Sequence, residues 1–538
     1  MHRRLLVTGA IAVVVTAALA GSGLGSAASR VRGAQRVPRG LAAAIHARFG
    51  AGTIRSGSAA SATIDPHLGL AVALSADGTT ALVGAPGVAG DRGAAYIFHA
   101  SEAGSWSSSG KPIATLRNTS MGAGSFGRAV ALSADGTTAF VSAPFVGAGP
   151  FGAGAIYVFH VSAEDAWASS SKPKAKLTVS SHAFDFGLGL SLALSADGTT
   201  LVAGAPFYND FVGEALVFHV SSEDAWASSS TPTAILNTPS NSEDDVGYVV
   251  AISGDGTTAL VSDVGNPSGG GAFIYHVSAE SAWTSSSTPT AILTDTTVDS
   301  SDSFGNDLAL SGDGTLAVIS APGADKMDVY HASGAAAWAS TATPTATLTD
   351  TGVSWSGDHY VVPVVVSTDG TTILVLALAV NAKRGAAYVF RASSEGAWAS
   401  SSTPTATLTN AGAHSGDFLG AITGAFSADG ATALIGAYGV RSGTGAAYVF
   451  HAADESSWAT SSTPNAALTN DALAHCVVPK LRGLKLPAAR HALAVGRCNL
   501  GRVTKVHSAH RKGRVLSQSR KAGTRLGIGA KVNVRLGR

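Results

Sequence analysis

The chain has 538 residues, of which 45 % are apolar and only 13 % are charged, and its formal net charge is +1. Charged residues are about half as frequent as in average soluble proteins, and Ser, Thr and Gly take their place, which suits strands and turns at an extracellular surface. Beyond the N-terminus no apolar run reaches the about 20 residues of a spanning helix, and the cysteines and histidines lack metal-site spacing. These features exclude several membrane-spanning helices and a cysteine–histidine metal module.

Charge is segregated along the chain. Residues 1–55 contain eight Arg and no acid, and residues 56–471 contain 12 basic residues and all 35 acidic ones, a formal charge of −23. Residues 472–538 contain 16 basic residues and no acid. An acidic body followed by a basic tail indicates a domain boundary between them.

The N-terminus has the three parts of a secretory signal. Two Arg in the first four residues precede an apolar run that ends at Ala20, and small residues continue to Ala28. We predict a signal peptide over 1–28, cleaved after Ala20 or Ala28, and a basic linker over 29–60. The run is shorter than a spanning helix, so export is favoured over a membrane anchor, with no transmembrane segment after cleavage.

A phrase related to Ser-Ala-Asp-Gly-Thr-Thr, first seen at residues 75–80, occurs seven times at steps of 56 to 62 residues. Its aspartates are Asp77, Asp135, Asp197, Asp255, Asp313, Asp369 and Asp429. A period near 60 residues, filled with short apolar runs and Gly/Pro punctuation, is typical of propeller blades rather than of a helical solenoid.

Each repeat reads as four short strands, which in the second repeat cover residues 129–133, 138–141, 155–159 and 175–178. The first three are nearly continuous apolar runs, as expected where neighbouring blades cover both faces. The fourth is Ser/Thr-rich and is predicted to be an outer edge, where Ser, Thr and Pro discourage association between sheets. Asp-Gly between the first two strands predicts a two-residue hairpin turn with positive φ at both residues.

Tryptophan and histidine recur at constant positions in the repeat. We interpret the tryptophans as anchors of the connection between strands three and four, rather than as a carbohydrate platform: Trp106, Trp167, Trp226, Trp283, Trp338, Trp398 and Trp458. The histidines after strand three lie on different sheets, cannot share a metal ion, and are interpreted as strand-end residues: His99, His160, His219, His276, His331 and His451, with Arg391 in the sixth repeat. Trp355 is out of phase and is the better candidate for a ligand contact.

Three further motifs mark the repeats: Phe-Gly at 126–127, Val-Gly-Ala-Pro at 83–86, and Gly-Ala-Ala-Tyr-Val-Phe at 385–390 and 445–450. They resemble the FG-GAP repeat of integrin-α-type propellers, in its bacterial variety, over residues 61–470. The resemblance implies a mainly β fold, a seven-bladed β-propeller of four-stranded blades whose first strands line the central channel. Repeats four to six are expected to be less regular blades. Every repeat supplies its own fourth strand, so no strand exchanged between the chain ends is expected, unless the segment Ala43–Ile54 provides one.

Integrin-type repeats often hold calcium in an Asp-rich loop between strands one and two. Here that connection carries one carboxylate in a short turn, whereas calcium takes six to eight oxygen ligands. We therefore predict no calcium at this loop and no cofactor elsewhere. Acidic loops at Glu243–Asp245 and at Asp295, Asp299 and Asp302 are interpreted as solvated charge.

The basic tail contains both cysteines, Cys476 and Cys498, which are predicted to form a disulfide because two cysteines in an exported protein most simply pair. An Ala-rich helix is expected over Leu486–Val495. Further motif residues are Val478, Pro479, Gly483, Gly501, Gly523, Val532 and Val534. Together they resemble a PASTA domain over 476–538, a small α+β module associated with peptidoglycan binding, although Arg520 stands where Pro is usual. The tail's cations predict binding to anionic polymers, or docking on the acidic body.

The sequence predicts an exported, non-catalytic binding or adhesion protein that is secreted, extracellular or cell-wall associated. The propeller loops would face an unknown protein or glycan ligand, and the tail would hold peptidoglycan or another anionic envelope polymer; nucleic acid is not expected, because an exported protein meets wall polymers first. The alternative is a secreted propeller hydrolase that acts on glycans, with the tail as its targeting module. Its candidate residues are Asp358 with His359 and His414 with Asp417, but no nucleophile or metal motif supports them.

Overall fold

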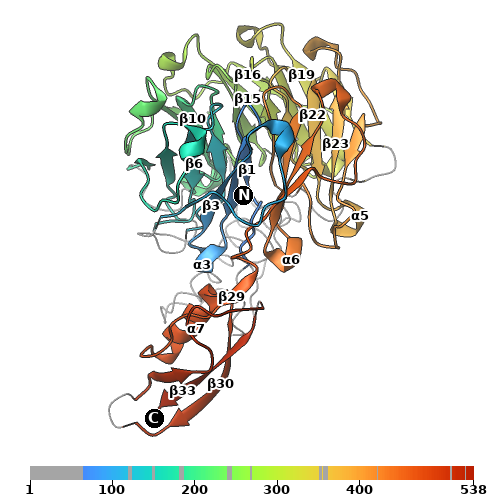
Figure 1. The fold of residues 1–538 in the computed structure, drawn as a ribbon. Helices are drawn as coiled ribbons and strands as arrows, with labels where there is room; N and C mark the ends of the chain where they lie inside the picture. The colour runs from blue at the N-terminus through green and yellow to red at the C-terminus, as the bar shows by residue number, and fades with distance from the viewer. Residues whose placement is uncertain are drawn as a thin grey trace, which may run out of the picture.

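The structure of this protein is a computed structural model. It describes residues 65–118, 124–147, 152–180, 187–238, 245–266, 269–350, 354, 362–420, 422–508, 512–527 and 529–538. Seven sheets and a smaller C-terminal unit make up this part of the chain (Figure 1). The predicted signal peptide (1–28) and basic linker (29–60) lie outside the described residues, as does the segment Ala43–Ile54.

The fold is mainly β, with seven four-stranded antiparallel sheets, one for each repeat. The strands of each sheet follow chain order, so the prediction of four strands per repeat is confirmed, and each repeat completes its own sheet. The sheets comprise β1 (Val72–Leu74), β2 (Thr80–Ala85), β3 (Ala94–His99) and β4 (Ala114–Leu116); β5 (Val130–Leu132), β6 (Thr138–Ser142), β7 (Ile156–His160) and β8 (Ala175–Leu177); β9 (Leu192–Leu194), β10 (Thr200–Ala205), β11 (Glu214–His219) and β12 (Ala234–Leu236); β13 (Val250–Ile252), β14 (Thr258–Asp263), β15 (Gly271–His276) and β16 (Ala291–Leu293); β17 (Leu308–Leu310), β18 (Leu316–Ala321), β19 (Lys326–His331) and β20 (Ala346–Leu348); β21 (Val364–Val366), β22 (Thr372–Ala377), β23 (Ala386–Arg391) and β24 (Ala406–Leu408); β25 (Gly424–Phe426), β26 (Thr432–Ala437), β27 (Ala446–His451) and β28 (Ala466–Leu468).

Short helical turns punctuate the connections within the sheets. Four lie between strands two and three: α3 (Val88–Asp91), α4 (Tyr208–Phe211), α5 (Val380–Lys383) and α6 (Val440–Gly443). The 3-10 turns are η1 (Ala103–Ser105), η2 (Glu164–Ala166), η3 (Glu223–Ala225), η4 (Glu280–Ala282), η5 (Pro322–Ala324), η6 (Ala335–Ala337), η7 (Glu395–Ala397) and η8 (Glu455–Ser457). All but η5 lie in the connection between strands three and four.

Sheets four to six are as regular as the others, so the prediction of irregular blades there is wrong for the described strands. Their first strands are three residues long and pair with the second strand in the same way as in the first sheet. The altered Phe-Gly and Gly-Ala-Pro motifs leave these strands intact because the apolar runs and the Asp-Gly turn are retained in all three repeats.

The turn between strands one and two differs from the predicted type. Gly78 has a φ of +73°, and the equivalent glycine is positive in all seven repeats, but none of the seven aspartates is. The N–H of Gly78 donates to the carbonyl of Ser75 (3.0 Å). This is the pattern of a type I turn followed by a left-handed glycine, not of a two-residue turn with two positive φ values. Glycine adopts a positive φ at no steric cost, and in this turn type the preceding aspartate keeps a negative φ.

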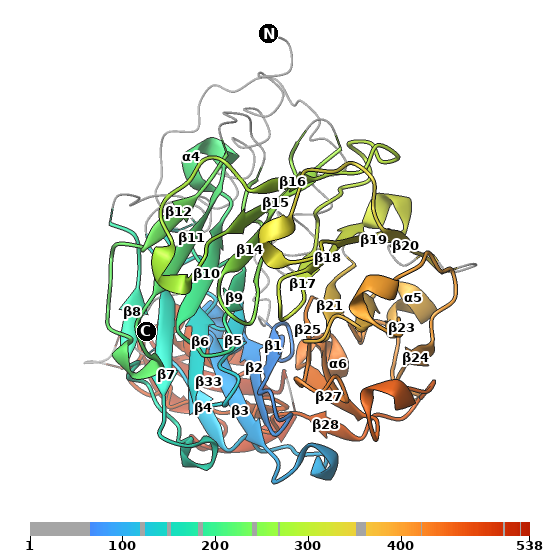
Figure 2. The same cartoon turned by 90° about the horizontal axis from the view of Figure 1, so that it is seen from above.

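The first strands of neighbouring sheets contact each other, and β1 contacts both β5 and β25. Single parallel bridges also join the sheets, such as Gly93 with Phe126 and, between the seventh and first sheets, Gly445 with Leu68. In Figure 2 the labelled first strands lie toward the middle of the view and the fourth strands toward its rim. The sheets at the two ends of the repeat region therefore pack together as neighbours along the chain do, by surface contact between complete sheets.

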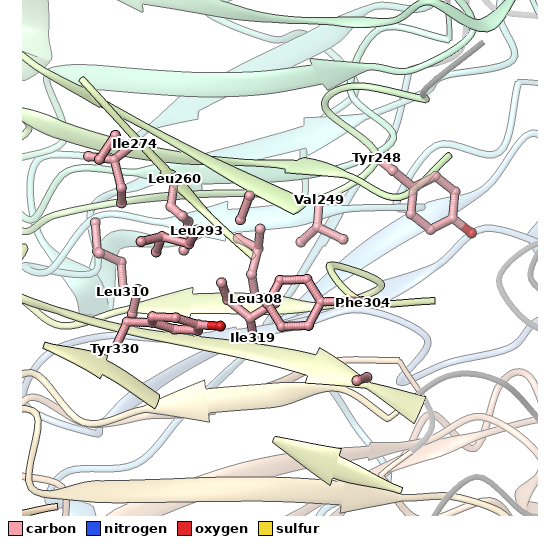
Figure 3. Packing of buried hydrophobic residues seen from close by; sticks show 14 of the residues in the cluster. Tyr248, Val249, Leu260, Ile274, Leu293, Phe304, Leu308, Leu310, Ile319 and Tyr330 are labelled. Atoms are coloured by element: carbon pink, nitrogen blue, oxygen red, sulfur yellow. The ribbon is translucent and has the colours of Figure 1, made fainter. Parts of the chain in front are cut away.

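The apolar core is divided among the spaces between sheets. All six residues of β2 are buried, as its continuous apolar run predicts. Six clusters each combine residues of two adjacent sheets, and a seventh adds Leu190 and Phe207 of the third repeat to residues of the fourth and fifth sheets. This last cluster packs Leu260 and Ile274 of the fourth sheet against Ile319 and Tyr330 of the fifth (Figure 3). Burial of each such side chain contributes about 1.5–3 kcal/mol, so stability is spread around the sheets.

The C-terminal tail has its own sheets and core. Its elements are β29 (His475–Val477), α7 (Leu486–Val495), β30 (Asn499–Val506), β31 (Val515–Gln518), β32 (Arg525–Gly527) and β33 (Lys531–Gly537). The helix matches its predicted range. One sheet has the order β30-β33-β31, with β30 parallel and β31 antiparallel to β33, and β29 pairs with β32. No helix in the described part of the chain is long and apolar enough to cross a membrane.

Candidate functional site

The aspartate of the repeated phrase serves its own turn. Asp77 accepts hydrogen bonds from the Ser75 hydroxyl (2.6 Å) and from the backbone N–H and hydroxyl of Thr79 (3.0 and 2.9 Å). Burial alone would raise the pKa of Asp77, but these hydrogen bonds outweigh it and hold the pKa below its usual range. Equivalent contacts involve Asp135, Asp197, Asp255, Asp313, Asp369 and Asp429. The seven carboxylates are therefore occupied by hairpin hydrogen bonds.

A glutamate from the next sheet joins several of these turns. The hydroxyl of Thr79 lies 2.6 Å from a carboxylate oxygen of Glu164, which belongs to η2 of the second sheet. The same pairing joins Thr137 with Glu223, Thr199 with Glu280 and Thr315 with Glu395. Sequence reasoning missed these glutamates, although each stands three residues before a repeated tryptophan. They connect neighbouring sheets on the side of the repeated turns.

The repeated Trp and His residues form hydrogen bonds within their own repeat. The indole N–H of Trp106 donates to the carbonyl of Gly78 (2.8 Å), and all seven tryptophans make this contact. Nδ1 of His99 lies 2.9 Å from the hydroxyl of Thr80, and His160, His219, His276 and His451 are placed likewise. Arg391 reaches the equivalent Thr372 (3.0 Å). The structural interpretation is confirmed for the residues that make these contacts. His331 is also a strand-end residue, but its register partner is Leu316, which has no hydroxyl. Trp355 lies outside the described residues.

The next repeat covers the outer edge of each fourth strand. The hydroxyl of Ser169 accepts the N–H of Thr115 (3.0 Å), and the N–H of Ser170 donates to the Thr115 carbonyl (3.0 Å). Ser108 makes the corresponding contact with Ala467 between the first and seventh sheets (3.0 Å). The fourth strand is the outer strand of each sheet, as predicted. The prediction that its composition discourages contact between sheets is wrong, because serines of the next repeat bond to the backbone groups that an edge strand leaves open.

The residues considered for catalysis do not form a site among the described residues. Asp358 and His359 lie outside them. The His414 side chain is 89 % exposed, and its Nδ1 lies 3.8 Å from Asp417. Asp417 instead accepts the backbone N–H of His414 (2.7 Å) and so closes its own loop. No group of three or more His, Cys, Asp and Glu suited to a metal ion occurs in the described ranges.

One predicted acidic loop is a buried ion cluster instead. Asp295 is only 6 % exposed and pairs with the ammonium of Lys326, which also lies 2.9 Å from Asp328. Burial alone would raise the pKa of Asp295, but Lys326 and Thr297 lower it to about 2, whereas burial raises the pKa of Asp328 to about 6. Interpretation as solvated charge is therefore wrong for Asp295. Lys326 and Asp328 were detectable as charges that interrupt an otherwise apolar third strand.

The other acidic loop residues are not part of this buried cluster. Asp299 is exposed and binds the N–H and hydroxyl of Ser301 (2.7 and 2.5 Å), so these loop acids do not converge on one ion. Glu243 lies outside the described residues, as does Asp244.

Glu214 at the start of β11 is a second buried charge that sequence reasoning missed. Its residue is 2 % exposed, and one carboxylate oxygen has no hydrogen-bond partner. Burial raises the pKa of Glu214 to about 7. The group therefore makes folding sensitive to pH near neutrality.

Two small cavities lie beside repeated tryptophans of the first and seventh sheets. One of about 320 Å³ lies beside the first and seventh sheets and is lined by His99, Trp106, Lys111, Ile113 and Leu468 among others. A second of about 200 Å³ occupies the equivalent position on the seventh sheet. Because both repeat the same feature of the sheet, neither marks a distinctive site.

The tail, by contrast, presents its charges to solvent. Fourteen of its basic residues are exposed: Lys480, Arg482, Lys485, Arg490, Arg502, Lys505, Lys512, Arg514, Arg520, Lys521, Arg525, Lys531, Arg535 and Arg538. None of them forms an ion pair with an acid among the described residues, and the tail contains no acid of its own. The exposed surface is therefore uniformly positive.

Arg497 is the exception, because it fastens the tail to the body. Its residue is 6 % exposed, and its guanidinium donates to the hydroxyl of Thr444 (3.2 Å) and to the carbonyl of Leu473. It also lies 3.6 Å from the carboxylate of Asp65, just before the first sheet. Helix α7 contacts α3 at the same junction (Figure 1). Docking on the body thus uses one tail cation and leaves the fourteen named above exposed.

The predicted disulfide is present and braces this junction from the tail side. Cys476 and Cys498 are bonded, and both lie in the tail's apolar cluster beside Val478, Leu493 and Val534. Cys498 directly follows Arg497, so the crosslink holds the backbone of the docking residue against the tail core.

No known protein family matches this chain, and no curated protein is significantly similar to it.

Proposed function

We propose that this protein is exported and holds an anionic polymer of the cell envelope through its tail, without catalysing a reaction. The observation that carries the proposal is the tail surface, with fourteen exposed cations and no acid. A surface of one sign attracts oppositely charged polymers over long range and raises their rate of association. The body cannot supply this attraction, because residues 56–471 carry a formal charge of −23.

The proposal includes a closed seven-bladed β-propeller of FG-GAP type and a PASTA-like domain over 476–538. Contacts between β1 and β25, and the bridge between Leu68 and Gly445, support closure. The disulfide supports an oxidising compartment outside the cytosol, in line with the signal peptide expected over 1–28. Non-repeated propeller loops would face a protein or glycan ligand, since loops on a rigid scaffold commonly bind.

Sedimentation of the full-length mature protein with purified cell wall, at increasing salt, tests the proposal. A tail variant, Lys512→Glu with Arg520→Glu and Lys521→Glu, should leave the wall at much lower salt than the wild type, because screened attraction between charges carries the binding. The matched control makes the same change of charge on the body: Arg92→Glu, Lys111→Glu and Lys172→Glu, all exposed residues.

Equal loss in both variants, or no sedimentation of the wild type, would overturn the proposal. Release of soluble sugar from the wall by the wild type would instead support the glycan hydrolase.

A further inference from the structure

One face of the tail sheet is open and positively charged. Along β33 the side chains alternate: Val532 and Val534 are buried at 0 % and 2 %, whereas Lys531, Asn533 and Arg535 are exposed. Alternation of this kind places the valines on the apolar core and the polar residues on the opposite face of the strand. The two cations, four residues apart, are separated by about 13 Å along the strand.

Hydrogen-bonding side chains surround these cations. Thr504 on β30 and Ser517 on β31 are the register partners of Arg535, and both are exposed. The backbone bulge of β30 places the exposed Arg502 beside Asn533, whose side-chain oxygen accepts the Arg502 N–H (2.7 Å). The open face thus combines three cations with hydroxyl groups across three adjacent strands.

We propose that this open face, formed by Arg502, Lys531 and Arg535 with Thr504 and Ser517, is the contact surface for the polymer, and that the polymer is phosphodiester-linked. The inference rests on the proposed function, which it deepens by naming the face and the chemistry. An open face of this kind suits an extended chain that lies across the strands, with successive phosphates meeting successive cations. The guanidinium fork matches the geometry of phosphate oxygens, and the hydroxyls can donate to the same groups.

Charge favours phosphodiesters over the carboxylates of peptidoglycan. Each unit of a phosphodiester polymer carries a full negative charge and need not carry a cation. Peptidoglycan peptides carry amino groups beside their carboxylates, and these groups would be repelled by a tail with fourteen exposed cations and no acid. A ligand that carries both charges would be matched by a surface with both acidic and basic side chains. The tail has no acidic side chain, so its surface matches a ligand that carries negative charge alone.

Binding by the full-length protein can be measured against three probes: a lipid-free glycerol-phosphate polymer, polyglutamate with the same number of charges, and peptidoglycan stripped of phosphate polymers. The test variant carries Arg502→Gln, Lys531→Gln and Arg535→Gln. The control variant removes three other exposed tail cations, with Lys480→Gln, Arg482→Gln and Lys485→Gln. Melting curves of both variants, compared with the wild type, show that the tail is folded.

We expect the wild type to bind the glycerol-phosphate polymer at least tenfold more tightly than polyglutamate. The test variant should lose at least tenfold in affinity, and the slope of log K against log salt should fall by about 2 to 3, as for three lost phosphate contacts. The control variant should lose threefold at most. Equal losses in the two variants, or equal binding of polyglutamate, would overturn the inference. Binding to stripped peptidoglycan alone would overturn it while leaving the proposed function intact, and binding to no probe and no wall would overturn both.

Discussion

The seven-sheet body and the tail use polar side chains in opposite ways. In the body, residues that recur in each repeat bind the turn or the next sheet, as Asp77 and Trp106 do. In the tail, fourteen cations are exposed and, among the described residues, Arg497 alone forms an ion pair. Repetition therefore marks residues that build the sheets, whereas the exposed cations of the tail do not repeat.

The largest effect on stability is expected where a repeated residue is removed from the body. Trp283 is 4 % exposed and donates to the carbonyl of Gly256 (2.8 Å), so Trp283→Ala should lower the free energy of unfolding by about 3–5 kcal/mol in urea titrations. The exposed, non-repeated Arg520→Ala should stay within about 0.5 kcal/mol of the wild type. If Trp283→Ala lowers the free energy of unfolding by less than about 1 kcal/mol, the repeated residues of the body do not stabilise it more than the exposed residues of the tail.

Glu214 is a non-repeated charge inside the body, and it should make stability depend on pH. Its pKa is about 7 in the fold and about 4.3 in an unfolded chain, so the folded protein retains a proton between these values and its stability falls as pH rises from about 4 to 7. Glu214→Gln should remove this fall and be more stable than the wild type at pH 8 by about 3 kcal/mol, yet equal to it near pH 4. Unfolding midpoints over this pH range measure the difference, and parallel profiles would contradict the assignment.

The tail depends on its crosslink rather than on repeated contacts. Replacing Cys476 and Cys498 by Ala opens a loop with a sequence separation of 22 residues, and should lower tail stability by about 3 kcal/mol. Proteolysis should then cut residues 475–538 first and leave the seven sheets intact. Simultaneous cleavage of sheets and tail would show that the two regions unfold together.

The smallest effect is expected at the edge of a sheet. Ser169→Ala leaves the N–H of Thr115 without its acceptor and should cost about 1 kcal/mol in thermal or urea unfolding. The nearby exposed Ser171→Ala serves as the control and should be neutral. If both substitutions are neutral, the serine contacts between sheets add no stability.

The architecture was predictable because the same pattern of turn and strands recurs seven times in the sequence. The Asp-Gly phrase, the apolar runs and the predicted helix over Leu486–Val495 all have local signals, and they match the observed strands and helix. The positions of Glu164 and Ser169 were not predicted, because their partners lie in a different repeat and no local pattern names them. The charges of Lys326 and Asp328 in an apolar strand were visible in the sequence, but their pairing with Asp295 was not, because Asp295 belongs to the preceding repeat.

The position of the candidate site was only partly predictable. The basic tail was evident from charge alone, and the exposed face of β33 could be read from its alternating valines. The placement of Thr504 and Ser517 beside Arg535 depends on a parallel pairing and a bulge that the sequence does not reveal. Docking through Arg497 is likewise set by tertiary contacts, in which a single arginine meets Thr444 and lies near Asp65.

The place of Arg497 has a mechanical consequence. It contacts Thr444 in the last sheet's loop and lies 3.6 Å from Asp65 ahead of the first, so it spans the line where the two ends of the repeat region meet. A tension applied through a tethered tail would reach both sheets at once instead of peeling the last one from its neighbour. Shared loading of this kind resists rupture better than peeling, and this would suit the anchoring through the tail that we propose.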